Sequence, residues 1–347
     1  MMPNTSAAPR VSVVIPAYRA SAHVAGALDS IFEQTFTDFE AIVVNDGSPD
    51  TPELETVLAP YGARIRYLVQ ENRGAGAARN AGIRAARGEY VALLDADDRW
   101  APDFLWRQTS YLDAHAECDL VYSDAIINGD SQLAGRRFMD TAPSIDEVTL
   151  LALVAQRCNI ILSTVVARRA ILMSAGLFDE TLRRGQDFDL WLRLALRGAT
   201  IRYQRRVLAE RRVSADGLSG NAIAEIERAL TVLDRFGRMH HLEPHVRTAL
   251  RRRTLELVDC LEIEQGKQRI LEGHFAAARY HLSAPRHQPL KLRLARVGLQ
   301  VAPQLVRMAC LRLRPGAWNL VIGSLVHLVI VNLTNSMTKC PNEPMTK

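Results

Sequence analysis

Three carboxylates within four residues are the feature of this sequence that most clearly suggests chemistry. Asp95, Asp97 and Asp98 directly follow an apolar run at residues 91–94. Carboxylates this close repel one another and resist ionisation unless a cation shares the site. With no His or Cys beside them they make a hard oxygen site, which suits Mg²⁺ or Mn²⁺ and leaves positions open for substrate phosphates. The simpler alternative is that Asp97 or Asp98 caps a helix beginning at Pro102.

A second polar group, Asn45-Asp46-Gly47-Ser48, follows another apolar run at residues 41–44. As local structure it indicates a turn, because Asn, Asp and Gly tolerate the left-handed backbone conformation. As chemistry, a carboxylate just past a buried strand can accept hydrogen bonds from a ribose hydroxyl or a base N–H. These residues alone leave both interpretations open.

Residues 74–79 read GAGAAR, which superficially resembles a dinucleotide-binding fingerprint. The sixth position is Arg79 rather than Gly, and no Gly-Lys-Ser/Thr loop occurs, so neither phosphate-binding motif is present. Gly74 and Gly76 instead predict a close approach of the backbone to a ligand at a helix N-terminus. Arg79 and Asn80 would then lie near the same crevice. The alternative for Arg79 is a solvent-exposed position on an Ala-rich helix.

A fourth group of candidates lies in the sequence RRGQDFDLW, residues 183–191. Asp187 opens a predicted helix that ends before Gly198, and it shares a face with apolar residues three, four and seven positions later. Such an Asp is either an N-terminal cap or a functional carboxylate aimed into a cleft. Asp189 is predicted to point elsewhere and to be solvated.

The elements that must position these residues alternate between strands and helices. Apolar runs predict strands, and 3.6-residue periodicity predicts helices between them. Alternation of this kind predicts an α/β fold with a mostly parallel sheet, whose ligands bind at the carboxyl ends of the strands. The expected strands are residues 11–16, 41–44, 65–69, 91–94, 120–122 and 160–166, and the expected helices are 23–34, 53–59, 75–86, 104–114 and 145–155.

The chain has 347 residues, of which 48% are hydrophobic and 23% charged, as expected of a globular protein with a substantial core. Residues 1–10 are polar and predict no secretory signal. The five cysteines are odd in number, scattered and without metal-like spacing. This pattern favours reduced thiols in a cytoplasmic protein over a disulfide framework.

The positive charge is concentrated towards the C-terminus. No Asp or Glu lies between Glu272 and Glu343, whereas that stretch holds nine Lys and Arg residues. Subtracting these nine from the net charge of +5 leaves −4 for the rest of the chain. The basic character therefore belongs to the C-terminal region rather than to the candidate active site.

The C-terminal region reads as a helical appendage at residues 216–285 and a basic, apolar tail at 286–347. Residues 317–333 are mostly apolar but short and interrupted by Asn319, Ser324, His327 and Asn332. They are therefore not expected to span a membrane. Basic residues beside an apolar helix suit an anchor on an anionic membrane surface, and a helix docked on the protein is the alternative.

Taken together, the sequence resembles the family 2 glycosyltransferases, which have the GT-A fold, over roughly residues 10–215. The matching motifs occur in order and are VSVVIPAYRA (residues 11–20), IVVNDGSPD (42–50), ENRGAGAARNAGIRAARGEYVALLDADD (71–98) and RRGQDFDLWLRL (183–194). The implied organisation is a flexible N-terminus at 1–10 and a Rossmann-like GT-A domain at 11–215. The appendage and the tail follow it.

The resemblance implies inverting transfer of a sugar from a nucleotide-sugar, with a UDP-sugar expected, to an acceptor hydroxyl. Divalent Mn²⁺ or Mg²⁺ is the implied cofactor, with Asp97 as its ligand beside Asp95. The implied roles are nucleotide binding by Pro16, Ala17, Tyr18, Asp46, Arg79 and Asp95, and general-base catalysis by Asp187.

Two further positions are implied on the acceptor side. The family often has Glu before the catalytic Asp, and here that residue is Gln186, which we expect to shift acceptor preference. Residues 211–219, including Arg212, resemble a mobile lid. The acceptor is expected to be a saccharide or lipid-linked saccharide, in polysaccharide or glycolipid synthesis at the cytoplasmic face of a membrane.

Three other classes of function are less consistent with the residues. A sugar nucleotidyltransferase would need a Gly-rich, basic loop after the first strand, and residues 16–19 (PAYR) match it poorly. A catalytically weak binding scaffold would be indicated by loss of Asp97 or Asp187, and both are present. A nucleic-acid binder would need aromatic residues among the cations of the tail or a recognisable module, and neither is found.

Overall fold

The computed structural model describes residues 8–312 except for residues 131–132, 145–146, 214–221 and 287–289. The chain divides into two compact units, which are described separately below. The first unit comprises residues up to 221 together with 231–253. The second comprises residues 222–230 and everything from 254 onward.

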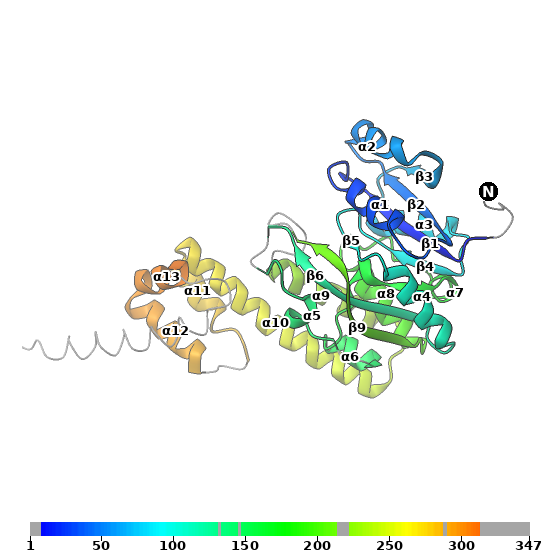
Figure 1. Ribbon diagram of the computed structural model, residues 1–347. Coiled ribbons are helices and arrows are strands. Elements are labelled where there is room, and N and C mark those ends of the chain that lie inside the picture. Colours follow the sequence, from blue (N-terminus) through cyan, green and yellow to red (C-terminus); the bar gives the residue numbers. More distant parts are fainter. Residues whose placement is uncertain (1–7, 131–132, 145–146, 214–221, 287–289, 313–347) are drawn as a thin grey trace, which may run out of the picture. The chain divides into compact units, whose positions relative to one another are not determined.

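A mixed β-sheet forms the first unit, with strand order β3-β2-β1-β4-β8-β6-β9-β5 and β7 paired to β9 (Figure 1). β1, β2, β3 and β4 are parallel, whereas β8 runs antiparallel to both β4 and β6. β6 and β9 are parallel, and β5 and β7 are antiparallel to β9. The strands are β1 (Val11–Ala17), β2 (Phe39–Asp46), β3 (Ile65–Gln70), β4 (Tyr90–Leu93), β5 (Arg99–Trp100), β6 (Leu120–Asn128), β7 (Glu147–Val148), β8 (Val166–Arg168) and β9 (Ile201–Arg212).

Burial on both faces explains the apolar runs of the parallel strands. Val13, Val14, Val43 and Leu93 are all fully buried, as expected for strands covered by helices on each side. The helices of this unit are α1 (Val24–Phe32), α2 (Thr51–Leu58), α3 (Ala75–Ala85), α4 (Phe104–Ala114), α5 (Phe138–Thr141), α6 (Leu150–Val154), α7 (Arg169–Ser174) and α8 (Gln186–Leu196), with short 3₁₀ helices at Ala59–Arg64 and Leu162–Thr164.

Helix α3 packs closely on β1 and β2 because it presents small residues to the sheet. Gly82 faces Val14 of β1, and a Cβ atom at position 82 would overlap the Val14 side chain. The first half of the helix is buried as well, including Arg79 and Asn80. This close packing fixes where the first turn of α3 meets the carboxyl ends of the strands.

The predicted α/β architecture with a C-terminal helical region is confirmed, and several boundaries differ. The predicted helix at 104–114 coincides with α4, whereas the helix predicted at 145–155 is only α6. Within the strand predicted at 160–166, residues 162–164 form a 3₁₀ helix and β8 begins only at Val166. β6 continues well past Tyr122, and β9 includes Arg211 and Arg212, for which the sequence predicts a loop.

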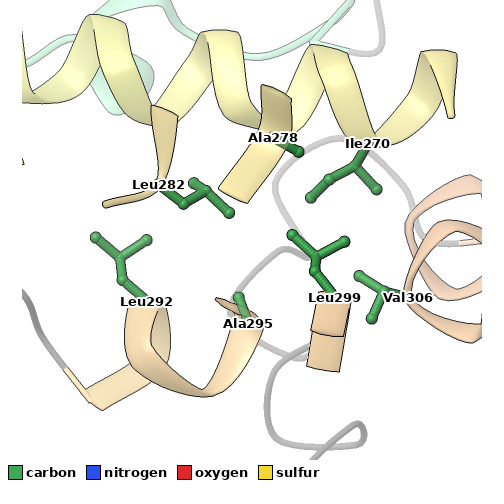
Figure 2. Close-up of a cluster of buried hydrophobic side chains, with 7 residues drawn as sticks. All are labelled: Ile270, Ala278, Leu282, Leu292, Ala295, Leu299 and Val306. Carbon is green, nitrogen blue, oxygen red and sulfur yellow. The ribbon is translucent and has the colours of Figure 1, made fainter. Parts of the chain in front are cut away.

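The second unit contains only helices within its described residues. They are α11 (Phe275–His281), α12 (Leu290–Val301), α13 (Pro303–Arg312) and the parts of α9 (Ala222–Met239) and α10 (Pro244–Glu272) that fall in this unit. Figure 2 shows its core, in which α11 contributes Ala278 and α12 contributes Leu292, Ala295 and Leu299, while Leu282 directly follows α11. Ile270 and Val306 complete this cluster.

No helix among the described residues is long and apolar enough to cross a membrane. The apolar stretch predicted as a surface anchor, residues 317–333, lies outside the described residues, as does the segment at residues 1–7. Within the part of the chain that the structure describes, Cys118, Cys158, Cys260 and Cys310 are not joined in disulfides.

Candidate functional site

A cavity of about 530 Å³ lies in the first unit and is lined by residues that follow β1, β2 and β4 and by the start of α3. Its lining brings together seven predicted site residues, from three of the four motifs that match the family. These are Pro16, Ala17, Tyr18, Asp46, Arg79, Asp95 and Asp97. Arg19, Ala20, His23, Asn72, Gly74, Ala75 and Ala96 also line it.

Asp46 holds the β3–α3 loop against the end of β2. Its carboxylate accepts hydrogen bonds from the Gln70 side chain (2.7 Å) and from the backbone N–H groups of Arg73 (3.0 Å) and Gly74 (2.8 Å). Gly47 is required beside it, since its φ is +60° and a Cβ atom would lie 2.6 Å from the Asn72 nitrogen. The turn interpretation is therefore right, and the same turn places Asp46 in the cavity wall.

The loop after β1 is tied to the loop after β2. The Arg19 N–H donates to the Ser48 hydroxyl (2.6 Å), and the Ser21 N–H donates to Asp50 (3.0 Å). Burial raises the pKa of Asp50, but hydrogen bonds from Ser21 and Ser48 outweigh it and bring the pKa to about 2. Arg19 has a φ of +52°, unusual for a residue with a side chain, and this conformation is held by these contacts.

Asp95 and Asp97 are two carboxylates in the wall of one cavity. Asp95 forms an ion pair with Arg79, and its N–H donates to the Ser163 hydroxyl (3.1 Å). Burial and the negative charge of Asp95 raise the pKa of Asp97. A cation between the two side chains would relieve this repulsion.

Asp98 lies behind the cavity wall rather than in it and is 4% exposed. It accepts a hydrogen bond from the Arg212 N–H (2.7 Å). Burial, Asp95 and Asp97 together raise the pKa of Asp98 to about 8. The alternative that Asp97 or Asp98 caps a helix is wrong, because β5 intervenes and the N-cap residue of α4 is Asp103.

The donor set fits a divalent cation that is completed by its substrate. Oxygen ligands from Asp97 and Asp95 suit Mg²⁺ or Mn²⁺, which commonly bind through one or two carboxylates plus substrate phosphates. Within the described ranges, no group of three or more His, Cys, Asp or Glu side chains forms a metal cage.

His23 and Arg212 meet beside the carboxylates. The Arg212 guanidinium donates to the His23 ring at 2.7 Å, and His23 lines the cavity. The positive charge of Arg212 offsets part of the rise in the pKa of Asp97, as does His23 when it is protonated. Arg212 ends β9, and most of the predicted lid, residues 214–219, lies outside the described residues.

Arg79 and Asn80 are neighbours on α3 with different surroundings. Arg79 is 8% exposed, with its guanidinium 5.7 Å from the Phe178 ring and its Nε without a hydrogen-bond partner among the described residues. The exposed-arginine alternative is therefore wrong. Asn80 does not line the cavity but exchanges hydrogen bonds with the Phe178 backbone (2.8 and 2.9 Å) and donates to Glu180 (2.9 Å).

Asp187 lies in the first turn of α8 and is half-buried. The N-cap position is Gly185, whose φ is +76°, so Asp187 is not the cap. A carboxylate in the first turn is stabilised by the positive end of the helix. Asp187 does not line the cavity.

Gln186 brings the start of α8 to the start of α3. Its side chain is 8% exposed, and a Cβ atom on Gly76 would lie 3.1 Å from its amide carbon. The amide nitrogen donates to the Leu182 carbonyl (2.6 Å). Since Gly74 and Ala75 line the cavity, this contact places the N-terminus of α8 beside the cavity wall.

The prediction for Asp189 is wrong. Its side chain is 4% exposed and pairs with Arg193 (2.8 Å), which also donates to the carbonyls of Ala175 and Leu177. This pair attaches α8 to the end of α7. Helical periodicity places Asp189 away from the face of Asp187 but does not reveal that a second packed surface lies there.

Sequence reasoning missed His23 and Ser163. His23 precedes an ordinary amphipathic helix, and Ser163 lies in a 3₁₀ turn far along the chain. Neither has a local motif, and only the packing of distant segments brings them to the carboxylates.

Comparison with known proteins agrees with this geometry. Residues 12–158 match the family described as glycosyl transferase family 2. An uncharacterised glycosyltransferase of Rickettsia prowazekii is 32% identical over 226 residues, which are 63% of this chain and 69% of that protein. One from Rickettsia felis is 33% identical over 215 residues, 60% of this chain and 35% of its own length. The amylovoran biosynthesis glycosyltransferase AmsB of Erwinia amylovora is 36% identical over 193 residues, 52% of this chain and 62% of AmsB.

Solved structures share the fold at lower identity. TarS of S. aureus in complex with UDP-GlcNAc has a TM-score of 0.56 at 20% identity. The match covers 87% of this chain and 90% of the TarS chain. The mannosyltransferase PcManGT of Pyrobaculum calidifontis, in complex with GDP-Man and Mn²⁺, has a TM-score of 0.61 at 19% identity. The match covers 96% of this chain and 89% of the PcManGT chain. The predicted GT-A architecture is thereby confirmed, and the chain belongs to glycosyl transferase family 2 and is a glycosyltransferase.

Proposed function

We propose that the protein transfers a sugar from a UDP-sugar to an acceptor hydroxyl with inversion at the anomeric carbon. The observation that carries this proposal is the convergence of residues from three separate strand ends and α3 on one cavity, whose lining includes the carboxylates of Asp46, Asp95 and Asp97. A nucleotide supplies the groups that such a lining can bind: a base, a ribose and a diphosphate. TarS with UDP-GlcNAc and PcManGT with GDP-Man and Mn²⁺ support a nucleotide-sugar donor and leave uridine and guanosine to be distinguished by experiment.

In the proposed donor site, Pro16, Ala17 and Tyr18 contact the base and ribose. Tyr18 is 46% exposed, so its ring is available for such a contact. Asp46 has accepted three hydrogen bonds from its own loop, and an ionised carboxylate retains a lone pair for a base N–H. Arg79 and Asp95, already paired, lie on the ribose and phosphate side.

The proposed chemistry needs charge neutralisation on one side of the sugar and a base on the other. A divalent cation held by Asp97, beside Asp95, would neutralise the charge that develops on the leaving diphosphate. Asp187 takes the proton of the acceptor hydroxyl, a contribution of typically 10²–10⁴-fold. Inversion requires base and leaving group on opposite sides, which fits a carboxylate supplied by α8 rather than by the strands that line the donor cavity.

We further propose a saccharide or lipid-linked saccharide acceptor, used in polysaccharide or glycolipid synthesis at the cytoplasmic face of a membrane. AmsB, whose name assigns it to amylovoran biosynthesis, supports a polysaccharide role. Gln186 would influence acceptor choice only indirectly, because its amide is buried against Gly76 and bonded within its own turn.

The test is nucleotide release from a panel of UDP-, GDP- and dTDP-sugars with Mn²⁺, with Mg²⁺ and with EDTA. We expect one donor to be hydrolysed slowly, in a metal-dependent reaction that Asp97→Ala abolishes. Asp187→Asn should preserve donor binding and reduce transfer by 10²-fold or more once an acceptor is supplied. Asp119→Asn, an exchange of the same kind outside the cavity, is the control.

The outcomes separate the alternatives. Donor binding without turnover under any condition would favour a binding scaffold. Release of pyrophosphate from a nucleoside triphosphate and a sugar phosphate would favour a nucleotidyltransferase. Absence of any nucleotide binding in the presence of metal would overturn the proposal.

A further inference from the structure

A second cavity, of about 630 Å³, lies within the second unit between α11 and α12. Three arginines line it: Arg279 of α11, and Arg293 and Arg296 of α12. Tyr280 and Val297 lie in the same wall. We propose that this pocket and the exposed face of α12 bind the phosphate groups of anionic phospholipids at a membrane surface. The proposal rests on the membrane location proposed above and gives it a defined site.

The arginines of this pocket are not neutralised by carboxylates. Among the described residues, none of the three forms an ion pair, and Arg279 donates only to the Leu299 carbonyl (3.4 Å). By contrast, Arg286 of the same unit pairs with Asp259, and Arg269 pairs with Glu272. The guanidinium group presents N–H donors in a planar fork that matches phosphate oxygens. Three unneutralised guanidinium groups around one cavity therefore favour a phosphate-bearing ligand.

The packing of α12 explains why its cations face outward together. Leu292, Ala295 and Leu299 occupy the buried face and point into the core (Figure 2). A stripe beside the buried face carries Arg293, Arg296, Val297, Gln300 and Val301, spaced three, four, seven and eight residues after the first. Arg296 is half-buried, and the other four are exposed. The core thus holds the helix in one orientation and presents this stripe on the surface.

The exposed apolar side chains beside the arginines favour a membrane over a soluble phosphate. Val297 and Val301 are 48% and 57% exposed, and Tyr280, next to Arg279, is 72% exposed. Valine side chains gain nothing from contact with a free phosphate ion, whereas they lose water-exposed surface at the boundary of headgroups and acyl chains. Tyrosine, with an apolar ring and a polar hydroxyl, suits the same boundary.

The absence of acidic residues extends this match beyond the pocket. From Gly273 to Asn342 the sequence contains no Asp or Glu. A membrane surface rich in anionic lipids attracts such a region and is not repelled by any carboxylate within it.

The experiment is sedimentation of the full-length protein with vesicles of phosphatidylcholine, with and without phosphatidylglycerol. The test variant is Arg293→Gln with Arg296→Gln. The control is Arg238→Gln with Arg251→Gln, two exposed helical arginines of the first unit, which makes the same change of charge. We expect the test variant to bind phosphatidylglycerol vesicles about 30-fold more weakly and the control less than threefold.

A second variant distinguishes a membrane from a soluble phosphate. Val297→Ser with Val301→Ser should weaken vesicle binding several-fold while leaving all three arginines in place. If inorganic phosphate, at matched ionic strength, displaces the protein from vesicles and the valine variant binds normally, the pocket is a site for soluble phosphate. That result overturns the proposal, as does equal binding of the arginine variant and its control.

Failure of this proposal is distinguishable from failure of the transferase function. Nucleotide release from the donor, measured without lipid, should be unchanged in the arginine and valine variants. Their far-ultraviolet circular dichroism and thermal unfolding should match those of the control. A membrane-binding defect with normal donor hydrolysis supports the lipid site, whereas normal lipid binding without any nucleotide binding overturns only the transferase proposal.

Discussion

At the scale of single residues, the Asp98 carboxyl group is the one whose surroundings oppose its ordinary charge most strongly in the candidate site. Burial, Asp95 and Asp97 raise the pKa of Asp98 from 3.8 to about 8. The unfolded chain therefore releases a proton near pH 4 that the folded chain keeps until about pH 8. Stability from this group is greatest below pH 4 and falls as the pH rises towards 8.

This titration predicts the behaviour of Asp98→Asn, which retains an oxygen to accept the Arg212 N–H. In EDTA, the variant should gain melting temperature relative to the wild type as the pH rises from 4 to 8. Mn²⁺ should reduce the gain, because a cation nearby favours the ionised carboxylate of the wild type. Thermal unfolding at each pH measures the difference. A difference in melting temperature that does not change with pH would contradict the raised pKa.

Asp46 gives a second prediction at this scale. Asp46→Ala removes the acceptor of the Arg73 and Gly74 N–H groups, so we expect a loss of about 1–3 kcal/mol in the free energy of unfolding. Nucleotide affinity should fall as well, because Gly74 lines the cavity. Glu71→Ala, an exposed position in the same loop, is the control for chemical denaturation and nucleotide titration. Unchanged stability would show that the loop does not depend on Asp46.

At the scale of elements, the approach of α3 to β1 depends on a single glycine. Gly82→Ala would force a Cβ atom into the Val14 side chain, which is buried within the sheet. We expect a loss of about 1–3 kcal/mol by overpacking and weaker nucleotide binding, since α3 carries Arg79. Gly26→Ala in α1 is the matched control, because its Cβ atom would meet only the Arg99 side chain, at 3.6 Å. The control should be neutral or stabilising by up to about 1 kcal/mol.

Chemical denaturation of both glycine variants measures this difference. Equal effects of the two substitutions would mean that helix propensity, rather than the distance between α3 and the sheet, decides stability. A destabilised Gly82→Ala variant with normal nucleotide affinity would show that Arg79 is positioned by contacts other than those of α3.

The elements that could be predicted from sequence are those whose own pattern of apolar and polar residues reflects which of their faces are buried. The parallel strands β1, β2 and β4 are covered on both faces and so read as continuous apolar runs. β9 could not be read in this way, because Arg202, Arg205 and Arg206 interrupt its pattern although it pairs with three strands. The antiparallel insertion of β8 between β4 and β6 is a long-range pairing, for which no local signal exists.

Residues of the candidate site could likewise be predicted only where the neighbouring sequence indicates their position. Carboxylates that end apolar strands, Asp46 and Asp95 among them, could be placed at one sheet edge because parallel strands end together. Residues with no motif, such as Ser163, enter only through tertiary packing. The strand predicted at residues 120–122 would put Asp124 at its end, but Asp124 lies fully buried within β6, where Arg137 pairs with it. The residues next to Asp124 in the sequence give no indication of a partner 13 positions away.

At the scale of the whole molecule, the core of the second unit is built from that unit's own residues. Leu299→Ala should therefore lower the stability of this unit by about 2–5 kcal/mol without reducing donor hydrolysis. Hydrogen exchange should accelerate in α11 and α12 and remain unchanged in β1, β2 and α3. Val297→Ala, an exposed position on the same helix, should leave exchange unchanged throughout. Faster exchange in the sheet would show that the two units unfold together.

The contacts of Asn80 bear on how new specificities could be built into this enzyme by exchanging segments with relatives. Asn80 binds the backbone of Phe178 at both its N–H and its carbonyl, and those two bonds would tolerate any side chain at that position. Its third bond, to the Glu180 carboxylate, depends on the side chain, and Arg73 pairs with the same group. A chimera that imports residues 176–191 should therefore keep a glutamate at position 180. It should also keep a buried aromatic residue at position 178, because the Phe178 ring lies beside the Arg79 guanidinium. Which residues such a segment must keep is therefore decided in part by Asn80 on α3, nearly 100 residues before the segment being exchanged.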